Sequence, residues 1–455
     1  MTQTRPNILL IMDDQHRHDY LGAAGAEFLN TPNLDRLSER GVHFTQCTTN
    51  CPVCAPSRIG LASGFQPSRI GSTGNDSYLP ANMTTYYQRL RDAGYRVGCV
   101  GKLDLAKPDG YNGRDGDRPR LFGWGFTHPV EVEGKMHAGM SDLPQGPYGF
   151  WLEEQELYQK FRDDYRLRGE RGWIKNASHD SVLPTEAFAD TYIGRRSADW
   201  ISQIPDDYPW HLFVSFVGPH DPFDPPTEYA DRYRNAEMPL AVESGRHEPA
   251  WVEARRLDLT AEEVTETRRQ YCASTELIDH QIGMILEALD RRGMRDNTYI
   301  IFASDHGEML GDRGQYTKSL PYEASVRVPL IAAGPGIQPG RTSDALIELI
   351  DLNPTICAIA GLVPQGQIDA RSFNTLLSGS KDDHRTETVS AIRNFRMIRT
   401  HQYKLIQHYN GITELFDLVE DPHELSNVAP RHPEMVRDLM QRMSSRFSAE
   451  AGRGA

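Results

Sequence analysis

Short apolar segments of strand length recur along this chain, and none alternates between apolar and polar residues. A strand that is covered on both faces is apolar at every position, so this pattern indicates a buried sheet. Helical patterns lie between the segments, which is typical of a mostly parallel sheet with helices on both sides. The segments read NILLIM, RVGCVG, HLFVSFVG, TYIIFAS and VPLIAAG.

Two helical segments carry recognisable boundaries. In TPNLDRLSERG, Thr31 is a candidate N-cap, Pro32 opens the first turn and Gly41 stops the helix. A much longer helical pattern, broken at most once, runs from about residue 260 to Gly293. These signals fit the helices that connect and cover parallel strands.

The pattern changes in two regions of the chain. Residues 114–185 are rich in Gly, Pro, Trp and charge without a clear period, which predicts a long loop insertion over one sheet edge. Beyond residue 376, hairpin patterns followed by a closing helix predict a small antiparallel α+β subdomain. We therefore expect an α/β protein with a main domain over residues 1–375 and a C-terminal subdomain over residues 376–455.

Charge and cysteine content restrict the partners and the compartment. The net charge of −14 argues against nucleic acid or an anionic membrane as partner, although local positive charge still permits an anionic substrate. The apolar run Ile8–Met12 is too short for a signal-peptide core, and no segment is long enough to span a bilayer. The six cysteines have irregular spacing, so we expect a reducing cytoplasm rather than a disulfide framework.

Polar residues follow the predicted strands at the points where they end. In open parallel sheets, ligands bind outside the carboxyl ends of the strands. Carboxylate and carbonyl oxygens suit Ca²⁺, Mg²⁺ or Mn²⁺, and an imidazole tilts the choice toward Mn²⁺. Taken singly, each residue could equally cap a helix or brace a loop. The residues concerned are Asp13, Asp14, Gln15, Lys102, Asp104, His220, Asp305 and His306.

The segment CPVCAPSRIGLASG contains a Cys-x-x-Cys pair with three ordinary interpretations. A redox dithiol would need a small βαβ context, and a zinc site would need a second pair of ligands. The third interpretation makes a cysteine a small buried residue. We apply this last interpretation to Cys51 and predict a chemical role for Cys54.

The residues after Cys54 resemble the modification signature of the type I sulfatases, in which the cysteine is oxidised to formylglycine (3-oxoalanine). Nearly the whole chain shares the resemblance, which lies nearest the choline-sulfatase and phosphonate monoester hydrolase branches of this alkaline-phosphatase-like superfamily. The motifs fall in the family's order. They are PNILLIMDDQ, TPNLDRLSERGVHFTQCTT, CAPSRIGLASG, GYRVGCVGKLD, GPHDPF, SDHGE, KSLPYEASVRVPLI and ELFDLVEDPHELSN.

The resemblance implies one divalent cation, and we expect Ca²⁺, with Mn²⁺ or Mg²⁺ as alternatives. The ligands that it implies are Asp14, Gln15, Asp305 and His306 together with the modified Cys54. Asp13 stays an alternative to Asp14. Gln15 follows the Asp-Gln pattern of the two branches named above.

Further roles follow for residues around the metal. Arg58, one helical turn after Cys54, is expected to reach back to the nucleophile, and Lys102 and Lys318 to neutralise sulfate oxygens. His220 is the expected acid for the leaving oxygen and a substrate contact. Asp104 stands where the family usually has histidine, so it is either a base or a salt-bridge partner of Lys102 or Lys107. Asn75 either donates to the substrate or shapes a turn.

The function implied is hydrolysis of a small-molecule sulfate ester, a sulfuric ester hydrolase. The alternative is a phosphonate monoester or phosphodiester hydrolase of the same superfamily. The resemblance also implies a maturation enzyme, either formylglycine-generating or anaerobic, as a partner. Aromatic segments at residues 120–126, 148–161 and 170–176 are expected to set the specificity for the alcohol, and a homo-oligomer is compatible with the sequence.

Overall fold

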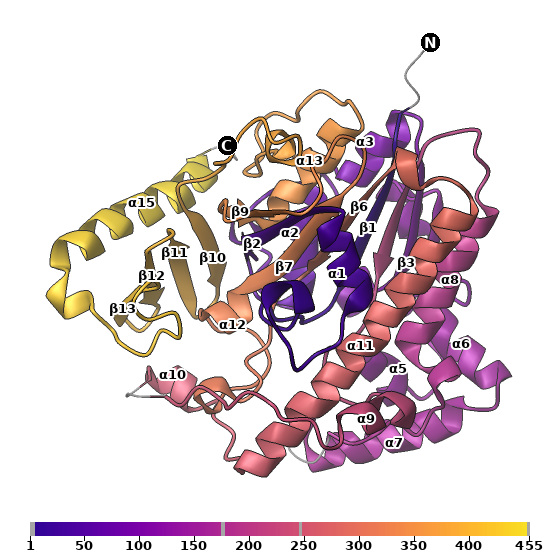
Figure 1. The fold of residues 1–455 in the computed structure, drawn as a ribbon, viewed down its shortest axis with the longest axis horizontal. Helices are drawn as coiled ribbons and strands as arrows, with labels where there is room; N and C mark the ends of the chain where they lie inside the picture. Colours follow the sequence, from indigo (N-terminus) through magenta and orange to yellow (C-terminus); the bar gives the residue numbers. More distant parts are fainter. Residues whose placement is uncertain (1–4, 174–177, 245–247, 453–455) are drawn as a thin grey trace.

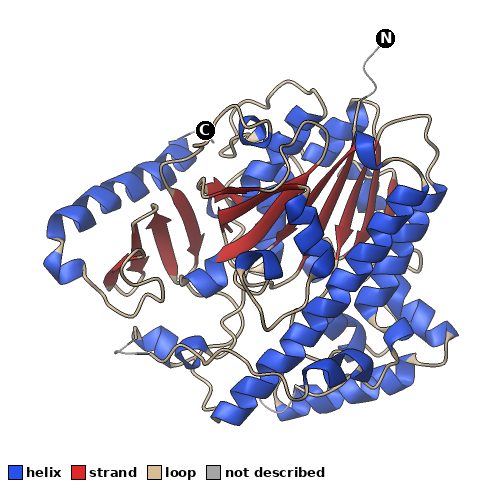
Figure 2. Cartoon of the chain, viewed as in Figure 1, coloured by secondary structure: helices blue, strands red, loops and turns tan. Residues whose placement is uncertain are grey.

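The computed structural model describes residues 5–173, 178–244 and 248–452, which build two sheets between layers of helices (Figures 1 and 2). The larger sheet has nine strands in the order β4-β3-β5-β1-β6-β7-β2-β8, with β9 beside β2. Its strands are β1 (Asn7–Asp13), β2 (Gly41–Thr48), β3 (Arg96–Gly101), β4 (His128–Glu131), β5 (Trp210–Ser215), β6 (Thr298–Ser304), β7 (Arg327–Ala333), β8 (Arg341–Ser343) and β9 (Ile347–Glu348).

The central strands β3, β5, β1 and β6 are neighbours and run parallel. Their registers align the strand ends, because Ser215 pairs with both Met12 and Gly101, and Asp13 pairs with Ser304. β7 runs antiparallel to both β6 and β2. The expected mostly parallel sheet is confirmed, and its carboxyl edge collects the residues that follow four separate strands.

Helices cover both faces of the larger sheet. On β1, Ile8 and Leu10 pack with α2, α3 and α13, whereas Leu9 and Ile11 pack with α1, α8 and α11 on the other face (Figure 1). This two-sided burial explains why the strand is apolar at successive positions. The helices outside the segment 114–185 and the C-terminal subdomain are α1 (Pro32–Glu39), α2 (Cys54–Ser63), α3 (Tyr86–Asp92), α8 (Ala189–Gln203), α9 (Thr227–Tyr233), α10 (Ala250–Glu253), α11 (Ala261–Arg291), α12 (Glu323–Val326), α13 (Leu352–Ile359) and α14 (Asn374–Leu377).

The boundaries of α1 and α11 refine the expectations from sequence. α11 is one continuous helix of 31 residues that opens with a capping box between Thr260 and Glu263. α1 ends at Glu39 with Arg40 as its C-cap, and Gly41 already belongs to β2. A Cβ atom at Gly41 would lie 2.0 Å from the carbonyl oxygen of Ala332, so this glycine permits the close approach of β7 rather than capping the helix.

The segment 114–185, expected to consist of long loops, contains edge strand β4 and several helices instead. In α7, the inward positions include Asp164 and Arg168, which form an ion pair at 2.6 Å. Charged residues at these positions hide the apolar period that would have revealed the helix. The helices are α4 (Pro119–Gly123), α5 (Lys135–Met140), α6 (Pro147–Glu154) and α7 (Tyr158–Arg171).

The predicted C-terminal subdomain is a four-stranded antiparallel sheet with the long helix α15 against it (Figure 1). One face of this sheet packs on α15, and the other packs on Cys51 and Val53, just ahead of α2. The small sheet thus supports the segment that presents Cys54. Its elements are β10 (Thr388–Ile392), β11 (Phe395–Arg399), β12 (Tyr403–His408), β13 (Thr413–Asp417) and α15 (Pro433–Gly452).

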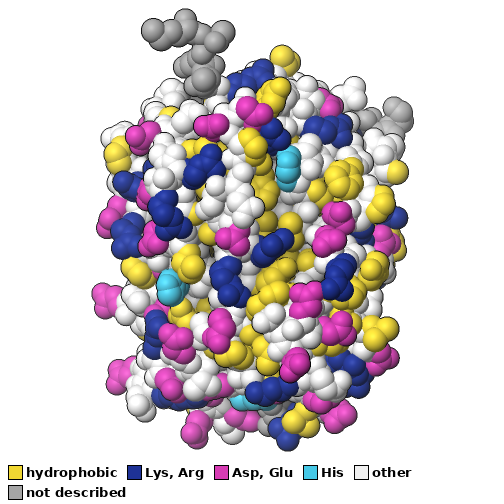
Figure 3. Space-filling model, turned by 90° about the vertical axis from the view of Figure 1, so that its right-hand side faces the viewer, with side chains coloured by type: hydrophobic (Ala, Val, Ile, Leu, Met, Phe, Trp, Pro, Cys, Tyr) yellow, Lys and Arg dark blue, Asp and Glu magenta, His cyan; other side chains and the backbone are white. Residues whose placement is uncertain are grey.

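Surface charge is mixed on one face of the molecule. On the face drawn in Figure 3, Lys and Arg are interspersed with Asp and Glu rather than gathered into a field of one sign. Among the described residues, no helix combines the length and the apolar character that crossing a membrane requires.

Candidate active site

Helix α2 places Cys54 at its first position and buries it completely. The helix starts after Val53, whose backbone is extended, and ends at Gly64 in the left-handed conformation with φ of 78°. All residues of α2 are buried, and Cys54 is 0 % exposed. The side chain at this position therefore acts inside the protein, not on its surface.

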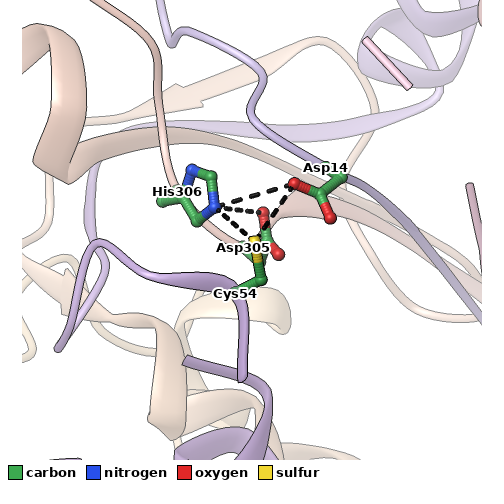
Figure 4. A group of neighbouring side chains, drawn as sticks. All are labelled: Asp14, Cys54, Asp305 and His306. Carbon is green, nitrogen blue, oxygen red and sulfur yellow. Dashed lines mark hydrogen bonds and ion pairs between the residues drawn. The ribbon is translucent and has the colours of Figure 1, made fainter. Parts of the chain in front are cut away.

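Cys54 lies among three side chains from the ends of β1 and β6 (Figure 4). Its Sγ atom is 3.2 Å from His306 Nε2 and 3.7 Å from Asp14 Oδ1. His306 Nε2 is also 3.6 Å from Asp14 Oδ1 and from Asp305 Oδ1. Ligand atoms of all four residues lie within 4.8 Å of one another, so segments far apart in sequence converge on one point.

This donor set fits a divalent cation. Ligand atoms at right angles around an ion with bonds of about 2.4 Å lie about 3.4 Å apart, close to the separations of 3.2–3.7 Å found here. Asp13 is excluded from the cluster, because its carboxylate pairs with His16 at 2.5 Å.

Arg58 contacts the acidic residues of the cluster rather than Cys54. Its guanidinium donates to Asp305 Oδ2 at 2.8 Å and to Asp14 Oδ2 at 3.3 Å, and also to the Ser215 hydroxyl at 2.6 Å. No hydrogen bond joins Arg58 to the sulfur in the described part of the chain. The expected reach back to the nucleophile is therefore replaced by a bridge between two carboxylates.

Lys102 and Asp104 form an ion-pair chain that starts at Asp14. Lys102 Nζ lies 2.5 Å from Asp14 Oδ2 and 3.2 Å from Asp104 Oδ2, and Asp104 Oδ2 also accepts from Lys107 at 2.7 Å. Although burial favours the neutral acid, the two lysines hold the pKa of Asp104 below its usual value. This geometry favours the salt-bridge alternative for Asp104, because a carboxylate with a lowered pKa is a weak base.

The Gln15 side chain is oriented by carboxylates that sequence analysis did not single out. Its Nε2 group donates to Glu308 and to Asp221 Oδ1, the latter at 3.1 Å, while its Oε1 atom accepts from Lys318 at 2.6 Å. Both carboxylates belong to quoted motifs, GPHDPF and SDHGE. Asp221 directly follows His220, and Glu308 lies two residues after His306. This proximity to predicted site residues could have identified both carboxylates from the sequence.

The remaining predicted residues lie near this centre. His220 Nε2 contacts Lys318 Nζ, and its Nδ1 atom faces the Asp221 carbonyl at 2.6 Å. The Oδ1 atom of Asn75 accepts from the backbone N–H of Ala55 at 3.2 Å, which ties its loop to the start of α2. Asn75, Lys102, His220 and Lys318 all line the same cavity of about 360 Å³.

Backbone strain and charge both concentrate here. Gln15, Asp104 and Thr317 have positive φ angles of 75°, 55° and 61°, a conformation that non-glycine residues seldom adopt outside functional sites. Burial by itself disfavours a thiolate, yet the positive charges of Lys102 and Lys318 hold the pKa of the Cys54 thiol well below its usual range. The site is built to stabilise negative charge at position 54.

Family models agree with this geometry. The sulfatase model matches residues 6–362, and a model for the C-terminal part of N-sulphoglucosamine sulphohydrolase matches residues 311–450. The first match covers most of the chain and contains every residue of the cluster.

Individual relatives share almost the full length. A choline-sulfatase of Rhizobium meliloti is 30% identical over 95% of this chain and 84% of its own, and an arylsulfatase of Clostridium perfringens is 29% identical over 93% and 90%. The crystal structure of a phosphonate monoester hydrolase of Agrobacterium radiobacter superposes with a TM-score of 0.83 at 25% identity, covering 98% of this chain and 96% of that one. The chain belongs to the sulfatase family of the alkaline-phosphatase-like superfamily and is a sulfuric ester hydrolase.

Proposed function

We propose that the enzyme hydrolyses a small-molecule sulfate ester with formylglycine, derived from Cys54, as its nucleophile. The observation that carries this proposal is the position of the Cys54 sulfur, 3.2 Å from His306 and 3.7 Å from Asp14 in a fully buried cluster. A structural cysteine would have apolar neighbours, as Cys51 does.

The modified residue would supply the nucleophile, and a cation would supply positive charge beside it. Once hydrated, the aldehyde supplies one hydroxyl that attacks sulfur and displaces the alcohol, and a second that loses its proton so that sulfate leaves. Asp14, Gln15, Asp305, His306 and position 54 would hold the cation, whose positive charge would acidify a hydroxyl at position 54. We propose Ca²⁺, with Mn²⁺ or Mg²⁺ as alternatives.

The other side chains hold these groups and the substrate in place. Arg58 fixes the two carboxylates, and Lys102 and Lys318 oppose the charge on the sulfate oxygens. His220 lines the cavity, with its Nε2 atom beside Lys318 Nζ, and we propose it as the acid for the leaving oxygen. Asp104 keeps Lys102 and Lys107 together. The amide of Asn75 contacts the substrate.

The cellular setting is part of the same proposal. Six free, buried cysteines support a reducing cytoplasm, and oxidation of Cys54 requires a dedicated maturation enzyme as partner. The catalytic domain spans residues 1–375, which places its boundary ahead of β10 and the small antiparallel sheet.

The rival activity is hydrolysis of phosphonate monoesters or phosphodiesters, which the structural similarity to a phosphonate monoester hydrolase favours. We expect kcat/KM for 4-nitrophenyl sulfate to exceed that for 4-nitrophenyl phenylphosphonate and for bis-4-nitrophenyl phosphate by at least about 10-fold. Steady-state assays on one metal-loaded preparation check this. A preference for either phosphorus ester would assign the enzyme to the rival branch.

Glu308 is expected to orient Gln15 for metal binding. Its Oε1 atom accepts from the backbone N–H of Leu310 at 3.0 Å and of Thr317 at 2.5 Å, which leaves Oε2 for the Gln15 amide. In Glu308→Gln, the new oxygen would serve the backbone donors and the new NH₂ group would face Gln15. The Gln15 NH₂ group would then keep only Asp221 as an acceptor, so the amide oxygen would no longer be held firmly in place for the cation.

We expect Glu308→Gln to weaken Ca²⁺ binding by about 10- to 100-fold, as is common for residues that orient metal ligands. Calorimetric titration of Ca²⁺ into metal-free protein measures this without relying on activity. Glu323→Gln, a buried glutamate paired with Arg399 and Lys404, is the matched control and should retain the affinity. Equal Ca²⁺ affinity in both variants would rule out the orienting role.

A further inference from the structure

The cavity beside the catalytic cluster extends well past the residues that face the sulfate. Beyond Asn75, Lys102, His220 and Lys318, its lining comes mainly from residues 103–118, after β3, and residues 131–137, after β4. Its volume of about 360 Å³ lies in the range of small-molecule pockets, about 300–1,000 Å³. These two segments therefore contact the alcohol part of the substrate.

Tyrosine, tryptophan and phenylalanine do not occur among the described lining residues of this cavity. The aromatic segments expected to set specificity pack elsewhere: Phe126, Tyr148 and Phe161 are at most 2 % exposed and belong to the hydrophobic clusters on the two faces of the sheet. Trp173 packs near Tyr165, and residues 174–176 lie outside the described residues. The described lining therefore lacks the aromatic faces that commonly hold a quaternary ammonium group.

Asn112 and His137 in the lining have hydrogen-bonding capacity that no described residue satisfies, and the Glu133 carboxylate there has an Oε2 atom that is shut off from solvent and also lacks a partner. Asn112 is only 8 % exposed, yet its side-chain amide has no partner in the described part of the chain, and its backbone N–H bonds to the Gln145 carbonyl. The amide atoms are not shut off from solvent, and Asn112 is one of the residues that line the cavity. The ring nitrogens of His137 likewise have no described partner, and this residue lies beside Gly110 in the same lining.

The side chains of Asn112 and His137 can each donate one hydrogen bond and accept another. Burial lowers the pKa of His137 from its ordinary value, so the ring is neutral at pH 7 with one donor and one acceptor nitrogen. An amide also carries both functions. Hydroxyl groups need partners of both kinds, whereas a carboxylate needs only donors and an aryl ring needs neither.

We propose that the natural substrate is the sulfate ester of a polyhydroxylated alcohol of about monosaccharide size, and that Asn112 and His137 bind its free hydroxyl groups. This inference rests on the proposed sulfatase activity. It distinguishes the enzyme from a sulfatase for choline-type or simple aryl esters, because those alcohols would leave the amide of Asn112 and the ring of His137 unpaired in the cavity.

The test compares kcat/KM for three substrate types on the metal-loaded enzyme: glucose and galactose monosulfates at each ring position, choline O-sulfate, and 4-nitrophenyl sulfate. We expect the best sugar sulfate to exceed choline O-sulfate by at least about 10-fold. In Asn112→Ala and His137→Leu, the ratio of kcat/KM for that sugar sulfate over 4-nitrophenyl sulfate should fall by about 10- to 100-fold. Asn394→Ala, the same change at an exposed asparagine outside the lining, should keep the ratio within about 2-fold.

The possible outcomes distinguish this proposal from the proposed sulfatase activity on which it rests. An unchanged ratio in Asn112→Ala and His137→Leu, or choline O-sulfate as the best substrate, would overturn the assignment of the alcohol while sulfatase activity stands. Turnover of phosphonate esters with no turnover of any sulfate would overturn the proposed function and this inference together.

Discussion

Cys54→Ala is expected to lower the turnover of 4-nitrophenyl sulfate by at least about 10⁴-fold, because loss of a covalent nucleophile removes the main route of an enzyme of this kind. No other described member of the cluster can replace it, since Asp14, Asp305 and His306 are the proposed metal ligands. The fold should persist, because the change removes a single sulfur atom from a small buried side chain. Steady-state kinetics and thermal unfolding measure the two effects.

Cys51→Ala provides the matched control. Cys51 is also completely buried, but it lies in a hydrophobic cluster with Val53 and Tyr322. We expect turnover within about 3-fold of the wild type, at a stability cost of about 1 kcal/mol for the lost packing. Mass spectrometry of the peptide that carries position 54 should show the aldehyde in the wild type and in Cys51→Ala. Substantial activity in Cys54→Ala would refute the nucleophile assignment.

Asp14→Asn should remove the bound cation and lower turnover by at least about 10³-fold. The carboxylate of Asp14 lies 3.6 Å from His306 Nε2 and 2.5 Å from Lys102 Nζ. An amide at this position offers the cation a neutral oxygen, and it leaves Arg58 and Lys102 with one carboxylate fewer to balance them. Elemental analysis of dialysed protein gives the metal content directly.

The adjacent Asp13→Asn variant separates the two neighbouring aspartates. Asp13 pairs with His16 and lies outside the cluster, so this variant should retain the metal even where its melting temperature falls. Full metal content in Asp14→Asn, or loss of metal in Asp13→Asn alone, would contradict the proposed ligand set.

The strands of the larger sheet were predictable wherever both faces are buried. β1, β3, β5, β6 and β7 are apolar at successive positions, and this property is visible in the sequence because helices cover both of their faces. β8 and β9 span only Arg341–Ser343 and Ile347–Glu348, lengths at which no period can be recognised. The helices between residues 114 and 185 escaped prediction, because α7 buries charged residues among its aromatic ones.

The site was predictable as a set of positions, but not as a set of contacts. Residues that directly follow parallel strands must lie at one edge, which brings Asp14, Lys102 and Asp305 together. The partner of each side chain depends on rotamers and neighbouring loops that a motif does not encode. Arg58 thus bridges carboxylates instead of touching Cys54, and Glu308 orients Gln15 without having been singled out.

The depth of Cys54 also imposes an order on events in the cell. An oxidising enzyme has to bind the thiol in its own active site. Cys54 is 0 % exposed at the start of α2, so the folded protein keeps its thiol inaccessible to such an enzyme. If position 54 is to become an aldehyde, the oxidising enzyme needs this segment exposed, as it is before the chain folds. In a host poor in that enzyme, folded molecules would keep the thiol, and a purified sample would have to be unfolded before the oxidising enzyme could reach it.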